Sequence, residues 1–306
     1  MTIVCVVGSA NTDLLSRVPR LPIAGETLHG SKFTIGFGGK GANQAVMAAK
    51  IGAQVRFLGW VGGDVFGVDT RRNFESVGID TRYLLEAQGL STGVAVISVD
   101  ETTGQNSIII VNGANDRLSP ADMQAAAEAI QTADVVVAQL EAPLEASIEA
   151  FRVAKAGANP PITILNPAPA RELPMELLAL TDILIPNEIE AEMIIGSPAT
   201  TPEQAEITAR KLIEYGPHTV IITMGDRGAF YVNGDGESAH VPTESAKVVD
   251  STGAGDSFVG TFAYLIGAGY PTAKAVTIAC AVASLSVQRE GTQSSYPTRD
   301  EVAHLL

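Results

Sequence analysis

Short apolar runs alternate with longer amphipathic segments along most of the chain. The short runs are rich in β-branched residues and apolar on both faces, which predicts buried strands. The predicted strands are Ile3–Val7, Val55–Trp60, Val135–Gln139, Ile162–Leu165, Ile183–Ile185 and Val220–Met224. The predicted helices are Gly41–Ile51, Val65–Val77, Pro120–Thr132, Leu144–Ala156, Glu188–Ile195, Pro202–Tyr215, Val259–Gly267 and Ala273–Val287. This alternation predicts an α/β fold with a doubly wound, mainly parallel central sheet flanked by helices.

Two segments, residues 12–35 and 88–112, interrupt the alternation. They contain short β-like pieces, including Thr92–Val99 and Asn106–Val111. We expect these pieces to form a small antiparallel sheet that stands off the main sheet as a lid, within a single domain covering residues 1–306. Ligands of such folds bind at the carboxyl ends of the parallel strands. We therefore expect the polar motifs to gather there.

Composition restricts the partners of this protein. The chain has 306 residues, 46% hydrophobic and 18% charged, which is typical of a globular protein with a sizeable core. Its formal net charge of −14 disfavours nucleic acids and anionic membranes, because both require a basic surface. An anionic ligand would have to be held locally, by backbone amides, a few Lys or Arg side chains, or a metal ion.

The cysteines and the start of the chain predict a cytoplasmic protein. Cys5 and Cys280 lie in apolar stretches far apart, which indicates buried free thiols in a reducing compartment. The first strand follows the N-terminus without the basic segment or cleavage site of a signal peptide, and no apolar run reaches the ~18 residues needed to cross a bilayer. The histidines and cysteines do not have the spacing of a zinc site.

The run from Val248 to Phe262 is the most informative segment for function. Asp250 and Asp256 flank three small residues, Gly253, Ala254 and Gly255, and an apolar helical stretch follows. The first amides of a helix have no intrahelical partners and bind anions. Asp256 would thus lie beside a bound phosphoryl group, where a base could deprotonate an attacking hydroxyl. The alternative is an aspartate that caps a helix at a glycine-rich turn.

A second glycine-rich segment spans residues 36–44. Gly36, Gly38 and Gly41 match the dinucleotide-binding pattern G-x-G-x-x-G, but that pattern should close the first strand of a βαβ unit, and the first strand here ends much earlier. We favour a turn that enters a helix and directs Lys40 and Asn43 at a polar ligand. The alternative is a glycine-rich connection with a solvated lysine.

Other polar residues follow the predicted strands. Asn11 and Asp13 follow the first strand, where they could bind vicinal hydroxyls or simply form an Asx turn. Glu141 follows a later strand. Asn187 and Glu190 share one face of a helical first turn, where an acid near phosphates could hold Mg²⁺ through water, although the helix dipole alone favours acids there.

The segment from Thr223 to Gly228 also follows a strand. It could face a nucleotide, and a tight turn explains it almost as well. The chain contains neither the phosphate-binding loop G-x-x-x-x-G-K-[ST] nor the serine of a nucleophile elbow.

Taken together, the motifs resemble the ribokinase branch of the phosphofructokinase-B-type carbohydrate kinases. The resemblance covers nearly the whole chain, through residues 8–13, 25–27, 36–44, 139–141, 165–170, 186–188, 250–256 and 291–297. The motifs most typical of that branch are Asn-Thr-Asp at 11–13, Gly-Gly-Lys-Gly-Ala-Asn-Gln at 38–44, Asn-Pro-Ala-Pro-Ala at 166–170 and Gly-Thr-Gln-Ser-Ser-Tyr-Pro at 291–297.

The resemblance implies an enzyme that uses ATP, Mg²⁺ and K⁺ to phosphorylate D-ribose at its 5-hydroxyl. Asp256 would be the base, and the amides of Gly253, Ala254 and Gly255 would form an anion hole. The implied sugar-binding residues are Asn11, Asp13, Gly39, Lys40, Asn43, Glu141 and Asp256. The implied nucleotide-binding residues are Asn187, Thr223, Gly225, Gly228, Gly255 and Cys280, with Glu190 holding Mg²⁺ through water. The implied potassium site consists of Asp250 and Ser295 with carbonyls near Thr252, Ser286, Arg289 and Gly291.

The sequence departs from the family pattern at two positions. Ser251 stands where a threonine is usual, which we expect to matter little. Cys280 stands where relatives often carry Asn or His beside the adenine, so the base preference stays open. Asp250 also has an alternative partner, because Arg289 or Lys247 could fold in and replace the potassium ion.

The edge strands of a lid are exposed unless they pair, which predicts a homodimer joined through the lids. Two other functions stay open. One is a kinase of the same family for another sugar, such as deoxyribose or fructose, and Asp13 is the leading candidate to contact the deciding 2-hydroxyl. The other is a non-catalytic sugar-binding sensor, which the presence of Asp256 disfavours because binding alone needs no base.

Overall fold

The computed structural model describes residues 1–243 and 246–306. Within these residues, the main sheet has nine strands in the order β13-β12-β11-β10-β9-β8-β1-β4-β5. Pairing is parallel from β5 to β11 and antiparallel at β12 and β13. The strands are β1 (Ile3–Val7), β4 (Gln54–Gly62), β5 (Leu84–Ala87), β8 (Val135–Ala138), β9 (Ile162–Leu165), β10 (Ile183–Leu184), β11 (Thr219–Thr223), β12 (Ala229–Asn233) and β13 (Ser238–Val241).

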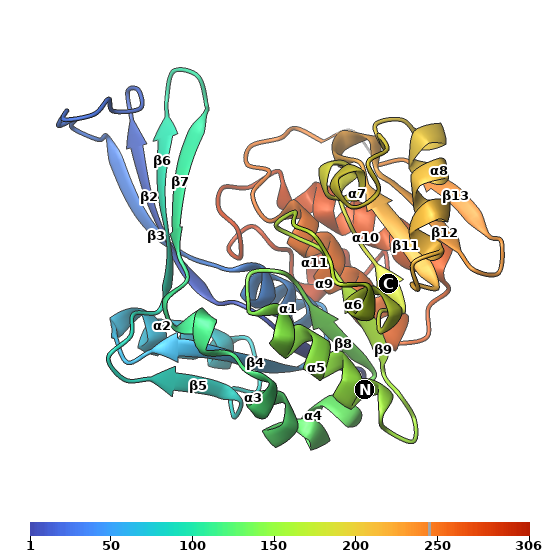
Figure 1. Cartoon of the computed structure of the whole chain (residues 1–306). Coiled ribbons are helices and arrows are strands. Elements are labelled where there is room, and N and C mark those ends of the chain that lie inside the picture. Colours follow the sequence, from blue (N-terminus) through green and yellow to red (C-terminus); the bar gives the residue numbers. More distant parts are fainter. Residues whose placement is uncertain (244–245) are drawn as a thin grey trace.

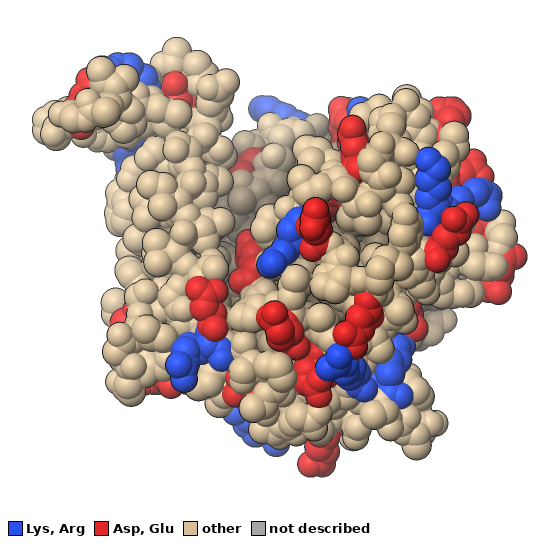
Figure 2. Space-filling view, viewed as in Figure 1, with Lys and Arg blue, Asp and Glu red and all other residues tan. Residues whose placement is uncertain are grey.

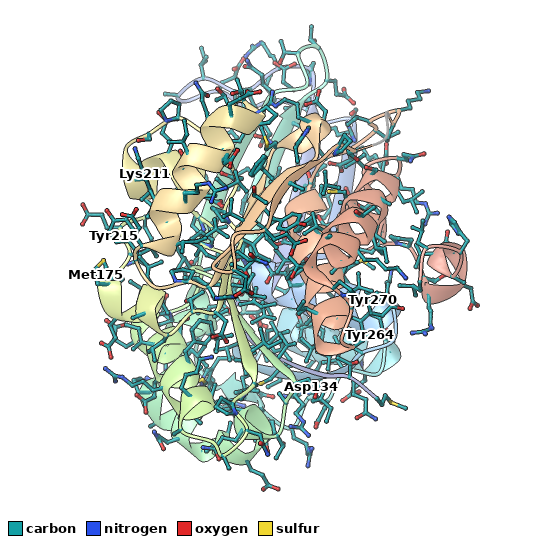
Figure 3. All side chains as sticks on the ribbon, turned by 90° about the vertical axis from the view of Figure 1, so that its right-hand side faces the viewer. Asp134, Met175, Lys211, Tyr215, Tyr264 and Tyr270 are labelled. Atoms are coloured by element: carbon teal, nitrogen blue, oxygen red, sulfur yellow. The ribbon has the colours of Figure 1, made fainter. Side chains whose placement is uncertain are left out.

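Helices cover both faces of this sheet (Figure 1). The α-helices are α1 (Lys40–Lys50), α2 (Val65–Ser76), α3 (Pro120–Ala125), α4 (Ala127–Gln131), α5 (Leu144–Lys155), α6 (Met175–Ala179), α7 (Glu188–Ile195), α8 (Pro202–Ile213), α9 (Ala254–Gly267), α10 (Thr272–Ser286) and α11 (Arg299–Val302). Figure 3 shows Lys211 and Tyr215, at the end of α8, and Tyr264, on α9, on opposite sides of the sheet.

Alternation along the buried strands divides the core in two. In β1, Val4 and Val6 pack into the core beneath α1, α9 and α10, whereas Cys5 and Val7 pack into the core on the α5 face. Such strands are apolar throughout because both faces are covered. The two cysteines are buried and unpaired, as predicted. In the part of the chain that is described, no helix has the length and apolar character required to span a membrane.

The six central strands match their predicted positions to within two residues. The predicted helix 120–132 is instead two helices, α3 and α4, which meet at Ala126. Helix α9 starts at Ala254, earlier than its apolar stretch predicts, so it includes Gly255 and Asp256. The strands β5, β12 and β13 were not predicted.

A second, four-stranded sheet stands off the body of the molecule, where Figure 1 shows it projecting to one side. It contains β2 (Asn11–Val18), β3 (Lys32–Gly38), β6 (Gly93–Asp100) and β7 (Asn106–Val111) in the order β3-β2-β6-β7. Its outer pairs are antiparallel, as expected, but the central pair β2–β6 is parallel. The reason is that β2 and β6 both leave the main body in the same direction, since each follows a strand of the main sheet.

This sheet carries few charged side chains. In Figure 2, the charged side chains visible on it lie mostly at its tip, whereas both signs cover the helices. Large apolar side chains are exposed on β3 and β7, among them Phe33, Ile35, Ile108 and Ile109, each at least 50% exposed. The base of the sheet, where Asn11 pairs with both Gly38 and Gly93, adjoins the carboxyl end of β1.

Candidate active site

Asp256 lies in the first turn of α9. Gly253, the residue just before α9, has a φ of 77°, a left-handed conformation that favours glycine. A side chain there would also collide with the loop opposite, because a Cβ would lie 2.4 Å from Cγ2 of Thr292 and 2.7 Å from the hydroxyl of Tyr296. That hydroxyl donates to the carbonyl of Gly253 at 3.0 Å. The glycine therefore lets the loop pack against the start of α9.

Two amides hold the carboxylate of Asp256. Asn43 Nδ2 donates to Oδ2, and Gln44 Nε2 donates to Oδ1, each at 2.9 Å. Burial raises the pKa of Asp256, while Lys40 and the two amides oppose the rise. A buried carboxylate with a raised pKa and fixed orientation has the properties of a general base.

The start of α9 also presents bare amides. Among the described residues, the N–H groups of Gly253, Gly255 and Asp256 have no hydrogen-bond partner. The N–H of Ala254, which was expected in the anion hole, instead donates to the carbonyl of Ser251 at 3.3 Å, because the chain makes a tight turn before the helix. A Cβ on Gly255 would meet no atom of the described residues within 4 Å, so a ligand can approach its backbone closely.

Two cavities meet at this helix end, with Thr223, Ser251, Ala254 and Gly255 lining both. The smaller cavity, of about 190 Å³, contains Lys40, Asn187, Glu190 and Asp256 among its lining residues. The larger, of about 490 Å³, extends to Gly225, Gly228 and Cys280. Their continuity suits a long ligand whose anionic end reaches the bare amides. Burial raises the pKa of the Cys280 thiol to about 12, so this residue offers a small neutral surface.

The predicted sugar-binding residues Lys40 and Glu141 lie close enough to Asp256 for their charges to act on it. Glu141 accepts hydrogen bonds from Ser9 Oγ at 2.6 Å and from the N–H of Lys40 at 2.9 Å. Burial would lower the pKa of Lys40, but Asp256, Glu141 and Glu190 together hold it above its ordinary value. The lysine is therefore a cation surrounded by three carboxylates.

Asn11, Asp13 and Gly39 complete this group. Gly39 begins α1 with a φ of 85°, and a Cβ there would lie 2.8 Å from the backbone nitrogen of Asn11. Asn11 Oδ1 accepts from Asn115 Nδ2 at 2.8 Å. Burial raises the pKa of Asp13 to about 7, and the nearby charges of Glu141 and Asp256 contribute further. A carboxylate with spare lone pairs can bind several hydroxyl groups.

Asn187 and Glu190 form a capping box at the start of α7. The N–H of Asn187 donates to Glu190 Oε2 at 2.8 Å, and the N–H of Glu190 donates to Asn187 Oδ1 at 2.8 Å. These two residues therefore cap the helix, a structural role that was not predicted from the sequence. Glu190 is also 6% exposed and lines the smaller cavity, and burial raises its pKa. Each of its carboxylate oxygens keeps a lone pair for water on a divalent ion.

The residues expected around potassium lie near the loop 291–296. Asp250 Oδ1 accepts from the N–H of Thr252 at 3.0 Å, and Oδ2 accepts from the N–H of Gly291 at 3.1 Å. Arg289 forms an ion pair with Glu301, so this arginine does not neutralise Asp250. Lys247 is exposed.

Ser286 and Ser295 are buried, and their hydroxyls donate to the carbonyls of Ala283 and Thr292. Both hydroxyls keep lone pairs that could contact a cation. Among the residues that the structure describes, no group of three or more His, Cys, Asp or Glu side chains could hold a metal. A cation at Asp250 would therefore need main-chain and hydroxyl oxygens, which suit K⁺ rather than a transition metal.

Several polar residues at the site were not predicted individually. Most belong to the sequence motifs that were recognised as a whole, namely Gln44, Gln139, Asn166, Gln293 and Tyr296. They connect the predicted residues through buried amides, as when Gln44 Nε2 also donates to Asn166 Oδ1 at 3.0 Å. Asn115 lies outside every motif, and nothing in its local sequence marked it.

Comparison with known proteins gives a consistent result. The model of the pfkB family carbohydrate kinases matches residues 1–299. A deoxyribokinase from Salmonella typhi is 42% identical over 304 residues, which cover 99% of this chain and 98% of that protein. A ribokinase from Mus musculus is also 42% identical over 304 residues, covering 98% and 93%.

The fold agrees with solved structures. The structure of Arabidopsis thaliana ribokinase complexed with ribose and ATP matches with a TM-score of 0.91 and 34% identity, covering 99% of this chain and 98% of that one. A ribokinase from Thermotoga maritima matches with a TM-score of 0.88 and 36% identity, covering 100% and 99%. The doubly wound sheet with a small second sheet, predicted from the sequence, is confirmed.

Proposed function

The chain belongs to the pfkB family of carbohydrate kinases, and we propose that it transfers the terminal phosphoryl group of ATP to the 5-hydroxyl of D-ribose. One observation carries the proposal. The carboxylate of Asp256, held by Asn43 and Gln44, lies in the first turn of α9, beside the bare amides of that turn and near Lys40 and Glu141. A base between an anion site and a hydroxyl-binding site is the arrangement that phosphoryl transfer to an alcohol requires.

The relatives support ribose as the acceptor. Ribokinases from Mus musculus and Schizosaccharomyces pombe are 42% and 40% identical to this chain over nearly its whole length. The Arabidopsis thaliana structure, in complex with ribose and ATP, shares its fold closely. We assign ATP to the two cavities that meet at α9, and ribose to the group comprising Asn11, Asp13, Gly39, Lys40, Asn43 and Glu141.

In the proposed reaction, the sugar hydroxyls bind to Asp13 and its neighbours, so that the 5-hydroxyl points at Asp256. Asp256 accepts the proton of this hydroxyl as its oxygen bonds to the terminal phosphorus of ATP, while the bond from that phosphorus to the β-phosphate oxygen breaks and ADP leaves. The amides of Gly253 and Gly255 and the ammonium of Lys40 stabilise the negative charge of the transferring group. Catalysis then comes mainly from positioning and charge stabilisation, as is usual for phosphoryl transfer.

Two cations complete the proposal. Mg²⁺ would neutralise the phosphates of ATP, and Glu190, with Asn187, would hold it through water, because Mg²⁺ prefers oxygen ligands and keeps much of its hydration. K⁺ would be held by Asp250, Ser295 and carbonyls near Thr252, Ser286, Arg289 and Gly291. There it would fix the loop that precedes Gly253, and so the direction of the amides. Arg289 pairs with Glu301 and not with Asp250, which supports a bound cation as the partner of Asp250.

The small sheet would act as a lid that closes over the bound sugar and excludes water, which prevents wasteful hydrolysis of ATP. Its exposed apolar strands support a homodimer in which two lids pair.

The main alternative is a deoxyribose kinase. The Salmonella typhi deoxyribokinase is as similar to this chain as the mouse ribokinase, so overall identity does not separate the two substrates. We favour ribose because Asp13, with its spare lone pairs, would be left unpaired by a sugar that lacks a hydroxyl.

The deciding experiment is an ADP-release assay with Mg²⁺-ATP and K⁺ over ribose, 2-deoxyribose and fructose. We expect the highest kcat/KM with ribose. A higher value with either other sugar would overturn the ribose assignment and leave the kinase assignment intact. Binding of sugar without ADP release from any of the three would instead identify a sensor. Asp256→Asn, assayed in parallel, controls for contaminating kinases.

A further inference from the structure

A line of side-chain amides, buried except for the half-buried Asn73, connects Asp256 to α2. Asn73 Nδ2 donates to Gln293 Oε1 at 2.8 Å, Gln293 Nε2 donates to Asn43 Oδ1 at 3.0 Å, and Asn43 Nδ2 donates to Asp256 at 2.9 Å. Gln293 is 6% exposed and lies on the loop 291–296. It lines neither cavity.

The direction of these hydrogen bonds matters. A side-chain amide has a donor end and an acceptor end, and rotation by 180° exchanges them. Asn43 can donate to Asp256 only while its oxygen faces away from the carboxylate, towards a donor. Gln293 supplies that donor, and Asn73 fixes Gln293 by occupying its oxygen. A rotated Asn43 would present its oxygen to the carboxylate and repel it.

The partner amide on Asp256 is fixed differently. Gln44 donates to both Asp256 and Asn166, and its oxygen accepts from Gln139 Nε2 at 2.6 Å. The side-chain amide of Gln44 is therefore held in one orientation by three hydrogen bonds. Among the described residues, the side chain of Asn43 has one hydrogen bond besides that to Asp256, and Gln293 donates it.

The loop that carries Gln293 is itself anchored. Lys50 Nζ donates to the carbonyls of Gln293 and Tyr296 at 2.8 and 2.9 Å. The Tyr296 hydroxyl in turn donates to Gly253, at the start of α9. One loop thus contacts both the turn that carries the bare amides and the amide that holds the base.

We propose that Gln293 is a positioning residue, which sets the orientation of Asn43 so that Asp256 faces the sugar hydroxyl as a hydrogen-bonded carboxylate. The inference rests on the proposed function, since it takes Asp256 to be the base. Gln293 lines neither cavity and contacts Asn43, so its proposed effect passes through Asn43.

The test compares Gln293→Leu with Gln293→Glu at saturating ATP, Mg²⁺ and KCl. Gln293→Leu removes the donor but keeps most of the volume, and we expect kcat to fall about 10- to 100-fold, because misplacing a reacting group by ~1 Å can cost on the order of 10²-fold. Gln293→Glu presents a carboxylate oxygen to Asn43 and favours the rotated amide, so we expect a larger loss. The KM for ATP should stay unchanged. Ser294→Ala, on the same loop and exposed, is the matched control and should resemble the wild type.

A second readout separates positioning from loss of structure. Without the donated hydrogen bond the pKa of Asp256 rises, so the acid limb of the kcat–pH profile should move to higher pH in Gln293→Leu. The variants change none of the charged groups near Asp256, so a shift of the acid limb does not come from them. These groups are Lys40, Glu141, Asp13 and Glu190, together with Lys50, which binds the loop. If Gln293→Leu does not fold, Asn73→Leu releases the far end of the line of amides and should give the same shift in milder form.

The outcomes are distinct. A normal kcat in Gln293→Leu would overturn the positioning role. So would equal losses of kcat in both variants, if the acid limb of the pH profile does not move and the melting temperature falls. No sugar-dependent ADP release from the wild type would overturn the proposed function, and this inference with it. Activity in the wild type with unchanged variants would overturn the inference alone.

Discussion

Asn43 donates a hydrogen bond to Asp256 across 213 positions of sequence. The two residues lie in the first turns of α1 and α9, whose N-terminal ends therefore face the same point. A helix N-terminus carries partial positive charge, so two of them meet at a carboxylate beside Lys40. This arrangement assembles positive potential where a phosphoryl group would accept a sugar oxygen, in a protein whose net charge is −14.

The first prediction concerns the base. Asp256→Asn keeps the size of the side chain but cannot accept a proton, so we expect kcat to fall roughly 10²- to 10⁴-fold, the usual contribution of a positioned base. The affinity for ribose, measured by calorimetry, should change much less. Asp69→Asn, at a half-exposed position on α2, is the control. Near-normal turnover in Asp256→Asn would remove this residue from the mechanism.

The second prediction is a pH dependence of sugar binding. Burial, Glu141 and Asp256 raise the pKa of Asp13 from 3.8 to about 7 in the protein without ligand. Protonated Asp13 has lost acceptor capacity for sugar hydroxyls. We therefore expect the Kd for ribose, measured by calorimetry, to decrease from pH 6 to pH 8 in the wild type. In Asp13→Asn the Kd should be higher and nearly independent of pH. An equally flat profile in the wild type would contradict the role of Asp13.

The same shift affects stability with a defined sign. Between the ordinary value of 3.8 and about 7, the folded protein retains a proton on Asp13 that the unfolded chain releases. The contribution of Asp13 to the free energy of unfolding therefore decreases as the pH rises through this window, and no further above it. Thermal unfolding without sugar should show the decrease in the wild type, and a smaller one in Asp13→Asn.

The third prediction concerns potassium. Asp250 binds two backbone amides and is not paired with Arg289, so a monovalent cation is its expected counterion. At equal ionic strength, we expect KCl to activate the enzyme strongly, NaCl much less and choline chloride not at all. Asp250→Asn should lose the difference between the salts.

Arg289→Gln provides the control for that prediction. Because Arg289 pairs with Glu301, its removal should leave potassium activation intact. Equal rates of the wild type in all three salts would exclude the potassium site. Loss of activation in Arg289→Gln would instead point to the arginine side chain as a participant.

The sequence predicted the centre of the fold better than its margins. Strands such as Ile3–Val7 and Ile162–Leu165 are buried on both faces, and a continuous apolar run specifies them without help from distant contacts. The hairpin of β12 and β13 follows another strand directly, and its outer strand is short and half-buried. The hairpin therefore departs from the two patterns on which the prediction depended, which are the alternation of strands with helices and the continuous apolar run of a buried strand.

Prediction of the site was also restricted to what local sequence patterns specify. Glycines and carboxylates in short motifs marked Gly39, Gly253 and Asp256, because each meets a local backbone or chemical requirement. The use of the Ala254 amide by Ser251 depends on turn geometry that the motif does not specify. The contacts of Gln293 with Asn43 and Asn73 join three distant segments, and no spacing along the chain could indicate them.

The last prediction concerns assembly. Strand β7 is an edge of the small sheet, and all six of its residues, Asn106–Val111, are exposed. Natural edge strands usually carry charged residues or proline that prevent pairing, but Ile108 to Val111 contain neither. Both faces of the strand expose large apolar side chains, Ile108 and Ile110 on one and Ile109 and Val111 on the other. A second copy of the same sheet is a self-complementary partner for this surface.

We therefore expect a dimer in light scattering coupled to size-exclusion chromatography. Ile109→Lys, at a position 62% exposed, should shift the protein towards monomer while its melting temperature in the monomeric state shows that the fold is retained. Ile207→Lys is the matched control, because Ile207 is 57% exposed on α8, far along the chain from the small sheet, and should leave the dimer unchanged. If pairing also stabilises the closed lid, Ile109→Lys will raise the KM for ribose more than the KM for ATP. A wild-type monomer at the highest soluble concentration would exclude the dimer, and a dimer that Ile109→Lys leaves intact would place the contact on another surface.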